Sequence, residues 1–333
     1  MLLTRVWGLA WLGFFISSSL YILGTTRTFV DATSALVTFT STYIVSTSSI
    51  LSHWKAKNQP LPLGRLAEFF ILGATCAIAT ALPLSDWALA FWNEGSPTCV
   101  MMTSFSCHWD DFLSASTCQM VCPTGMTCET KLMPLNDGSL SCNAKLAMQW
   151  VLTPGLIEEA SKAVWLRFWL WLTDVKHHPS AILLCGMSLG AGFETAENLR
   201  YAFPTGLDFS KSNPSRAVAA VNRALSSYLH VAWTGAVADA LAHGRSFIHA
   251  LLRVVVLHGL YDYGASLTIG LTFTSTLLSK LVTIPCVWLS VGPVNNRLKL
   301  YYAQLSLHNP IPSWSNSMFQ VSRCFIHRFL VRM

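Results

Sequence analysis

The chain of 333 residues is 52% hydrophobic and only 11% charged. A typical soluble domain has about 25% charged residues, and the mean hydropathy of +0.45 also points to a protein of the lipid bilayer. The net charge of +6 is distributed over connecting segments and the C-terminal part of the chain. No basic patch with interleaved aromatic residues is present, which argues against a nucleic-acid partner. We therefore expect a multi-pass membrane protein.

The apolar segments predict an all-α fold, a bundle of about eight transmembrane helices of roughly 20 residues each. In chain order the predicted spans lie near residues 6–23, 33–52, 66–92, 146–172, 180–203, 224–242, 247–265 and 267–291. The first has a cleaved signal peptide as its alternative. The predicted domains are an N-terminal three-span region (1–92), a cysteine-rich loop (93–145), a membrane core (146–265), a last transmembrane helix (266–291) and a basic tail (292–333).

The distribution of basic residues predicts the orientation. Lys55, Lys57 and Arg65 follow the second span, Lys176 follows the fourth, and the tail is also basic. Basic residues mark cytoplasmic loops, so we expect both termini in the cytoplasm. The basic loop at 204–223 is an exception, because the same scheme places it outside.

Six of the ten cysteines are concentrated in the predicted loop at 93–145, and they are Cys99, Cys107, Cys118, Cys122, Cys128 and Cys142. Such a cluster predicts a disulfide framework in an oxidising compartment, which places the loop in a lumen or outside the cell. The sequence does not choose among the possible pairings. A zinc knot is the alternative, but no CxxC pair is present. The other four cysteines fit small buried apolar residues or a tail thiol.

Polar residues interrupt four of the predicted spans. They are Glu158, Glu159 and Lys162 in the fourth span, Glu194, Glu197 and Asn198 in the fifth, His230 in the sixth, and His258 and Asp262 in the seventh. Ionisable groups are costly in a bilayer and mark functional sites by default. Glu197, His230 and His258 each lie about six to eight residues from the outer end of their span, or roughly 10 Å deep at 1.5 Å per residue. This shared depth predicts one common site.

Spacing within the helices suggests pairs. Glu158 and Lys162 are four residues apart and are expected to pair, and Asp262 is placed to orient His258 in the same way. A lone histidine such as His230 is more often a satisfied core residue, and it gains significance only beside the other clusters. For Asn198, a buried structural hydrogen bond is a serious alternative.

The motifs EExxK, FxxxEN, an isolated His and HxxYD follow one another in this order between residues 146 and 265. This order resembles the PrsW family of intramembrane proteases, which is related to the CAAX prenyl proteases and the CPBP proteins. The resemblance implies a helical membrane bundle with peptidase activity. It carries over to Glu158 and Glu159 for the first motif, Glu197 and Asn198 for the second, His230 for the third, and His258 with Asp262 for the fourth. Compact bacterial members lack the loop at 93–145, so substrate choice is not transferred.

These residues predict hydrolysis of membrane-anchored protein substrates near the outer face of the bilayer. Glu158 or Glu159 is expected to be the general base, while Glu197, His230 and His258 hold a divalent metal, with Zn²⁺ expected. In a metal-free alternative, a glutamate activates water, the histidines polarise it and Asn198 supports the oxyanion.

Two other classes of protein remain as alternatives. An ion- or proton-coupled transporter would have inverted repeats, which the sequence does not show. A catalytically inactive membrane scaffold would bind its partners through the cysteine-rich loop.

Overall fold

The computed structural model describes residues 61–94, 140–173, 175, 179–202, 215–266 and 273–306, together with Ala10, residues 12–20 and scattered positions between 36 and 50. Regular structure in these residues is entirely helical, and no strand occurs in them, which confirms the predicted all-α fold. The elements are α3 (Leu63–Leu72), η1 (Gly73–Ala77), α4 (Ile78–Glu94), α5 (Leu140–Trp150), η3 (Val151–Gly155), α6 (Leu156–Leu172), α7 (Pro179–Ala202), α8 (Ser215–Ala242), α9 (Phe247–Ser266) and α10 (Phe273–Ser306).

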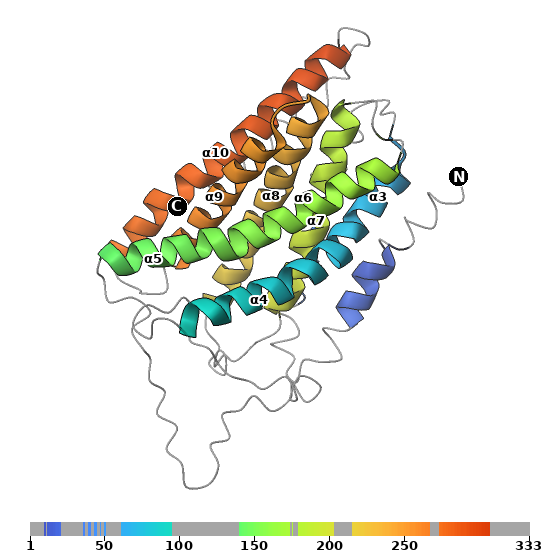
Figure 1. Cartoon of the computed structure of the whole chain (residues 1–333). Helices are drawn as coiled ribbons and strands as arrows, with labels where there is room; N and C mark the ends of the chain where they lie inside the picture. The colour runs from blue at the N-terminus through green and yellow to red at the C-terminus, as the bar shows by residue number, and fades with distance from the viewer. Residues whose placement is uncertain are drawn as a thin grey trace.

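Two long helices each contain a π-helical turn, and the helix continues through this turn without a loop. η1 joins α3 to α4, and η3 joins α5 to α6, so that α5, η3 and α6 form one long rod across the front of α8 and α9 (Figure 1). η3 contains Pro154, which lacks a backbone N–H and cannot continue an ordinary helical ladder. A proline inside a helix ordinarily kinks or restarts it, whereas here the structure has a wider turn. Such turns are frequent at functional sites, and here the glutamates of α6 follow immediately.

α7 is the central helix of the bundle, with α3 and η1 on one side and α8 on the other. Small residues allow this close approach. A Cβ atom at Gly186 would lie 2.9 Å from the carbonyl oxygen of Thr234, and one at Gly190 would lie 2.9 Å from the Thr234 hydroxyl. A Cβ atom at Gly192 would meet the backbone of Phe70. The glycines of α7 therefore serve close helix packing.

The far end of α8 is tied to α10 by charged side chains. Asp239 accepts a hydrogen bond from Arg245, in the turn before α9, and lies 3.4 Å from the guanidinium Nε of Arg297 on α10. Gly244 has a φ of 61° in this turn, a backbone conformation that suits glycine. These contacts tie α8, α10 and the turn before α9 together at this end of the bundle.

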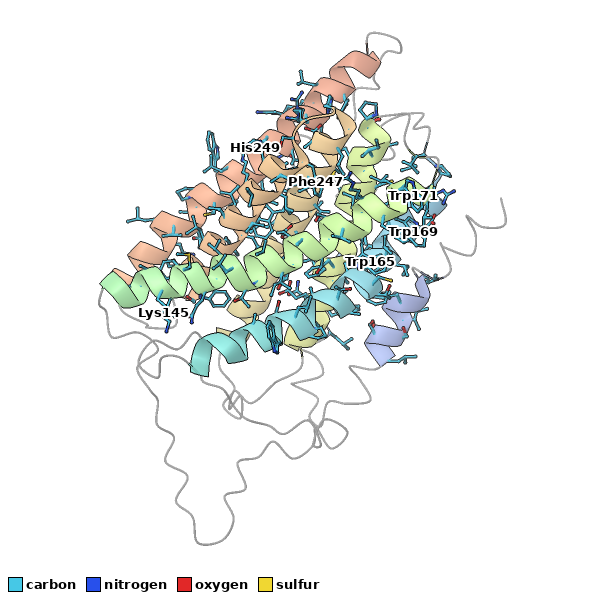
Figure 2. All side chains as sticks on the ribbon, in the orientation of Figure 1. Lys145, Trp165, Trp169, Trp171, Phe247 and His249 are labelled. Carbon is cyan, nitrogen blue, oxygen red and sulfur yellow. The ribbon has the colours of Figure 1, made fainter. Side chains whose placement is uncertain are left out.

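The outward faces of the helices are apolar. On α5 to α6, exposed side chains include Leu152, Val164, Phe168 and Trp171. Glu158, Glu159 and Lys162 of α6 are buried, whereas Arg167 is exposed. Figure 2 shows Trp165, Trp169 and Trp171 along the C-terminal half of α6. This arrangement is the reverse of a soluble protein and suits contact with lipid.

By length and composition, one helical stretch among the described residues, Leu63–Ser85, is long and apolar enough to cross a membrane, with a mean hydropathy of 1.7. It corresponds to the span predicted at 66–92. The helices of the core carry buried charges, which lower their hydropathy. α10 continues to Ser306, beyond the predicted end of the last span at 291 and into the segment expected to be a tail.

Most of the loop at 93–145 lies outside the described residues, and so do its predicted disulfides. The cysteines whose side chains are described are Cys76, Cys185 and Cys286. All three are free thiols, and Cys185 and Cys286 are buried, as expected for small apolar side chains.

Candidate functional site

The polar residues predicted from the sequence meet in the interior of the bundle. They come from four helices and comprise Glu158, Glu159 and Lys162 of α6, Glu194, Glu197 and Asn198 of α7, His230 of α8, and His258 and Asp262 of α9. All except Asp262 are 6% exposed or less, and the Asp262 side chain is 25% exposed. The shared depth inferred from the sequence therefore corresponds to a common cluster.

His258 is held by two carboxylates through its two ring nitrogens. Its Nδ1 lies 2.8 Å from Oε1 of Glu159, and its Nε2 lies 3.1 Å from Oδ2 of Asp262. The predicted contact with Asp262 is present. A third carboxylate oxygen, Oε2 of Glu158, is 3.8 Å from Nε2. Since an ionised carboxylate can only accept, Glu159 accepts a hydrogen bond from the proton of Nδ1. By the same rule Nε2 carries a proton when it bonds to Asp262, and a metal bound at Nε2 would replace that proton.

Lys162 pairs with Glu159 and not with Glu158, so the predicted partner was wrong. Its Nζ lies 2.5 Å from Oε1 of Glu159 and 2.6 Å from Nδ1 of His230, and it also lies 4.5 Å from the centre of the Phe193 ring. Side chains three residues apart meet on a helix as readily as those four apart. Glu159 points inward, beside both histidines, and in this position it forms the ion pair with Lys162.

His230 has a charged neighbour at each ring nitrogen. An ammonium group can only donate, so Nδ1 accepts from Lys162, and the proton of a neutral ring then lies on Nε2. That nitrogen is 3.1 Å from Oε2 of Glu194 and 3.4 Å from Oε2 of Glu197. His230 is therefore part of the ionic cluster and not an isolated core histidine.

Glu194 is a site residue that the sequence analysis did not assign a role, although it lies in the second motif. It is closer to His230 than Glu197 is. Asn198 donates a hydrogen bond from Nδ2 to Oε1 of Glu194, one helical turn away. The four-residue spacing of Glu194 and Asn198 was the signal for this contact. Asn198 thus makes the structural hydrogen bond that was weighed as its alternative role.

Each histidine also lies against an aromatic ring. The ring of Phe193 stacks on His230 with centroids 5.4 Å apart, and the indole of Trp233 stacks on His258 with centroids 4.4 Å apart and planes 19° apart. The two imidazoles meet edge to face at 4.9 Å. Sequence analysis missed Trp233, because an aromatic residue in an apolar helix resembles ordinary core.

The cluster carries more negative than positive charge. Glu158, Glu159, Glu194 and Glu197 are buried beside one lysine, which leaves an excess of acid when the glutamates are ionised and the histidines neutral. Buried charges need partners of opposite sign. The chemistry of this donor set, glutamate oxygens and imidazole nitrogens, suits a divalent transition-metal ion such as Zn²⁺.

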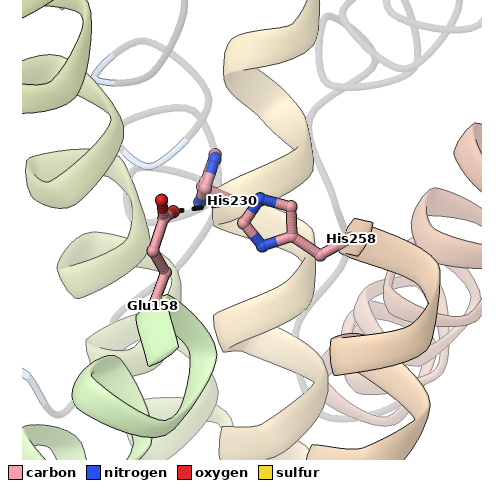
Figure 3. A group of neighbouring side chains, drawn as sticks. All are labelled: Glu158, His230 and His258. Carbon is pink, nitrogen blue, oxygen red and sulfur yellow. Dashed lines mark ion pairs between the residues drawn. The ribbon is translucent and has the colours of Figure 1, made fainter. Parts of the chain in front are cut away.

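Two sets of ligand atoms are compact enough to hold such an ion, and His230 belongs to both. One comprises Glu158, His230 and His258, and the other comprises Glu194, Glu197 and His230, with the atoms of each set within 4.8 Å of one another. Figure 3 shows the first set converging from three helices. A tetrahedral zinc with bonds of about 2.0–2.1 Å separates its ligand atoms by roughly 3.4 Å. The separation of 3.8 Å between His258 Nε2 and Glu158 Oε2 is close to this value.

A serine nucleophile is not supported by the geometry. Gly186 to Gly190 read Gly-Met-Ser-Leu-Gly and match the GxSxG pattern of serine hydrolases, which requires a turn between a strand and a helix. In the structure this segment lies within α7, and the buried hydroxyl of Ser188 donates to the carbonyl of Leu66 at 2.6 Å. Ser188 therefore serves helix packing.

Comparison with known protein families agrees with the chemistry of the cluster. The profile of the PrsW family intramembrane metalloproteases matches residues 115–290, slightly more than half of the chain. No curated protein and no solved structure matches. The matched range includes α6, α7, α8 and α9, which provide the whole cluster. The chain belongs to the PrsW family of intramembrane metalloproteases.

Proposed function

We propose that this protein is a peptidase that hydrolyses membrane-anchored proteins with a metal centre in the core of its helix bundle. The observation that supports this most directly is the buried cluster of four glutamates, two histidines and one lysine inside a bundle with apolar outer faces. Such a cluster is costly in lipid and is maintained for function. Water, a base and a Lewis acid are what peptide hydrolysis needs.

We further propose that Glu158, His230 and His258 hold the metal, and that the metal is Zn²⁺. At His230 it would replace either the Lys162 ammonium at Nδ1 or the proton at Nε2. Two histidines and one glutamate with an open position form a known catalytic zinc arrangement. The sequence suggested Glu197 as the third ligand, but Glu197 does not share a compact set with both histidines, whereas Glu158 does. Oε2 of Glu158 is buried and accepts no hydrogen bond from the described residues, so it is available as a ligand. When bound, the metal would activate water and polarise the scissile carbonyl.

The remaining residues have supporting roles in this proposal. Glu159 accepts the Nδ1 proton of His258 and leaves Nε2 for the metal, the usual arrangement of a carboxylate behind a metal-bound histidine. The sequence predicted Glu158 or Glu159 as the general base, but both have other roles in this proposal. Glu197, whose Oε2 lies 3.4 Å from Nε2 of His230, takes that role instead, and Asn198 positions Glu194. Asp262 is more exposed than the other acids and lies 3.1 Å from Nε2 of His258, so it would lie beside the bound metal.

A single substitution separates the ligand role of Glu158 from the role of general base. If Glu158 is a ligand, Glu158→Gln lowers both the metal content of the purified protein and its proteolytic activity. If Glu158 is the base, the variant keeps its metal and loses only activity. Metal content is measured by mass spectrometry of detergent-purified protein, with a Ser188→Ala variant as a folding control.

The activity assay does not require an identified substrate. Membranes from cells that express the wild type or the Glu158→Gln variant are compared for new protein N-termini. We expect single-span proteins to gain N-termini near the outer end of their span with the wild type only. Identical sets of N-termini for both proteins would contradict the proposed function and favour a transporter or a scaffold.

A further inference from the structure

Trp233 has a specific position beside the cluster that the proposed chemistry does not use. It is 1% exposed and is among the largest fully buried side chains among the described residues. Its indole lies face to face with the ring of His258, and the edge of His230 meets it at 5.0 Å between centroids. One aromatic ring therefore contacts both histidines of the cluster.

The indole is itself fixed by a hydrogen bond that it donates to α10, a helix that contributes no member of the four motifs. Nε1 of Trp233 donates to Oγ of Ser290 at 2.7 Å, and Ser290 donates its own proton to the carbonyl of Cys286 at 2.5 Å. Since the only proton of the hydroxyl is committed to Cys286, its lone pairs are directed to accept from the indole. The chain of two bonds sets the angle of the Trp233 ring.

His258 needs such a contact, because the carboxylates control only part of its orientation. The terminal torsion of histidine is broad and has no sharp staggered minimum. Glu159 and Asp262 contact the two nitrogens at the edge of the ring. The tilt of the ring is therefore controlled by the groups that pack against its faces. A flat indole at 4.4 Å and 19° restricts this tilt.

We infer that Trp233 and Ser290 are positioning residues that orient the imidazole of His258 for a divalent metal ion. The inference rests on the proposed function, in which His258 is a ligand. This inference adds α10 to the site, because Ser290 of α10 accepts the hydrogen bond of the indole. Neither residue touches the metal or the substrate in this scheme, and both act through the angle of one ring.

The test uses Co²⁺ as a probe, because its visible absorption reports the geometry of its ligands. Full-length protein is purified in detergent, stripped of metal with a chelator and titrated with Co²⁺. The variants are Ser290→Ala and Trp233→Phe, and each removes the hydrogen bond between the indole and the hydroxyl. Ser290→Ala keeps a small side chain on α10, and Trp233→Phe keeps an aromatic ring on α8. Ser188→Ala is the matched control, because it also removes a buried hydroxyl that bonds to another helix but lies outside the cluster.

We expect Ser290→Ala and Trp233→Phe to weaken Co²⁺ binding by about 10-fold, the lower end of the range for groups that orient metal ligands, and to change the absorption spectrum. The double variant should be no weaker than either single variant, because both changes remove one bond. Ser188→Ala should keep the wild-type affinity and spectrum.

The outcomes separate the two proposals. Wild-type affinity and spectrum in both site variants would overturn the positioning role and leave the metal centre intact. An equal loss in Ser188→Ala would also overturn it, because the effect would then be one of general packing. Absence of Co²⁺ binding to the wild type would overturn the metal centre and the positioning role together.

Discussion

Replacement of Lys162 by Met tests the charge balance of the cluster most directly. Met keeps much of the length of the lysine stem and removes its charge. Lys162 is fully buried, and its ammonium lies within 2.6 Å of both Glu159 and His230. With four ionised glutamates, an ionised Asp262 and neutral histidines, the substitution changes the charge of the cluster from −4 to −5. Removing one partner of a buried ion pair costs about 3–5 kcal/mol.

A divalent cation should offset this loss. A metal ion brings two positive charges to a cluster that has lost one, so it should bind the variant at least as tightly as the wild type. A ligand present at 100 times its dissociation constant stabilises the folded protein by about 2.7 kcal/mol. We therefore expect Lys162→Met to be strongly destabilised without metal and to recover much of its stability when metal is added. The gain should exceed that of the wild type.

The assay is thermal unfolding of detergent-purified protein, followed by tryptophan fluorescence with chelator or with saturating Zn²⁺. Lys145→Met is the matched control, because Lys145 lies on the same long rod, in α5, is partly exposed and is not part of the cluster. Equal metal-induced shifts in the wild type and Lys162→Met would refute the reasoning. So would a metal-free Lys162→Met protein that is as stable as the wild type.

Three further predictions concern individual positions. His230→Ala should lower the metal content of the purified protein, because His230 belongs to both candidate ligand sets, whereas His249→Ala should leave it unchanged. Gly190→Ala should reduce both stability and activity, since its Cβ atom would meet the His230 carbonyl, while Gly292→Ala should be tolerated in open space; thermal unfolding compares the two. The six cysteines of the loop at 93–145 should resist thiol labelling until a reductant is added, and ready labelling from the cytoplasmic side would invert the predicted topology.

The membership of the cluster could be predicted because helical geometry limits which side chains meet. Glu197, His230 and His258 have similar depths in separate helices, and depth follows from residue counts along each helix. The contact of His258 with Asp262 also followed from a four-residue spacing. These inferences need only the rise and repeat of a helix.

The details of the contacts could not be predicted in the same way. Glu158 and Glu159 are adjacent in the sequence, and either can reach Lys162 by a spacing of three or four residues. The choice depends on how far η3 turns the start of α6, and η3, which contains Pro154, packs against α9. For the same reason the sequence did not indicate Glu158 in place of Glu197 as the proposed metal ligand, because that choice depends on how α6 and α7 face each other.

The position of Trp233 shows why the residues of a membrane site can be predicted only in part from the sequence. A charged residue in a predicted span stands out, because lipid penalises it and only function maintains it. An aromatic residue does not, because lipid, protein core and active site all accept it. Polarity therefore points to candidate site residues, while the neighbours proposed to orient them become visible only through distances such as those that join His258, Trp233 and Ser290. Residues of this second kind are the ones for which a structure of a membrane enzyme adds most to its sequence.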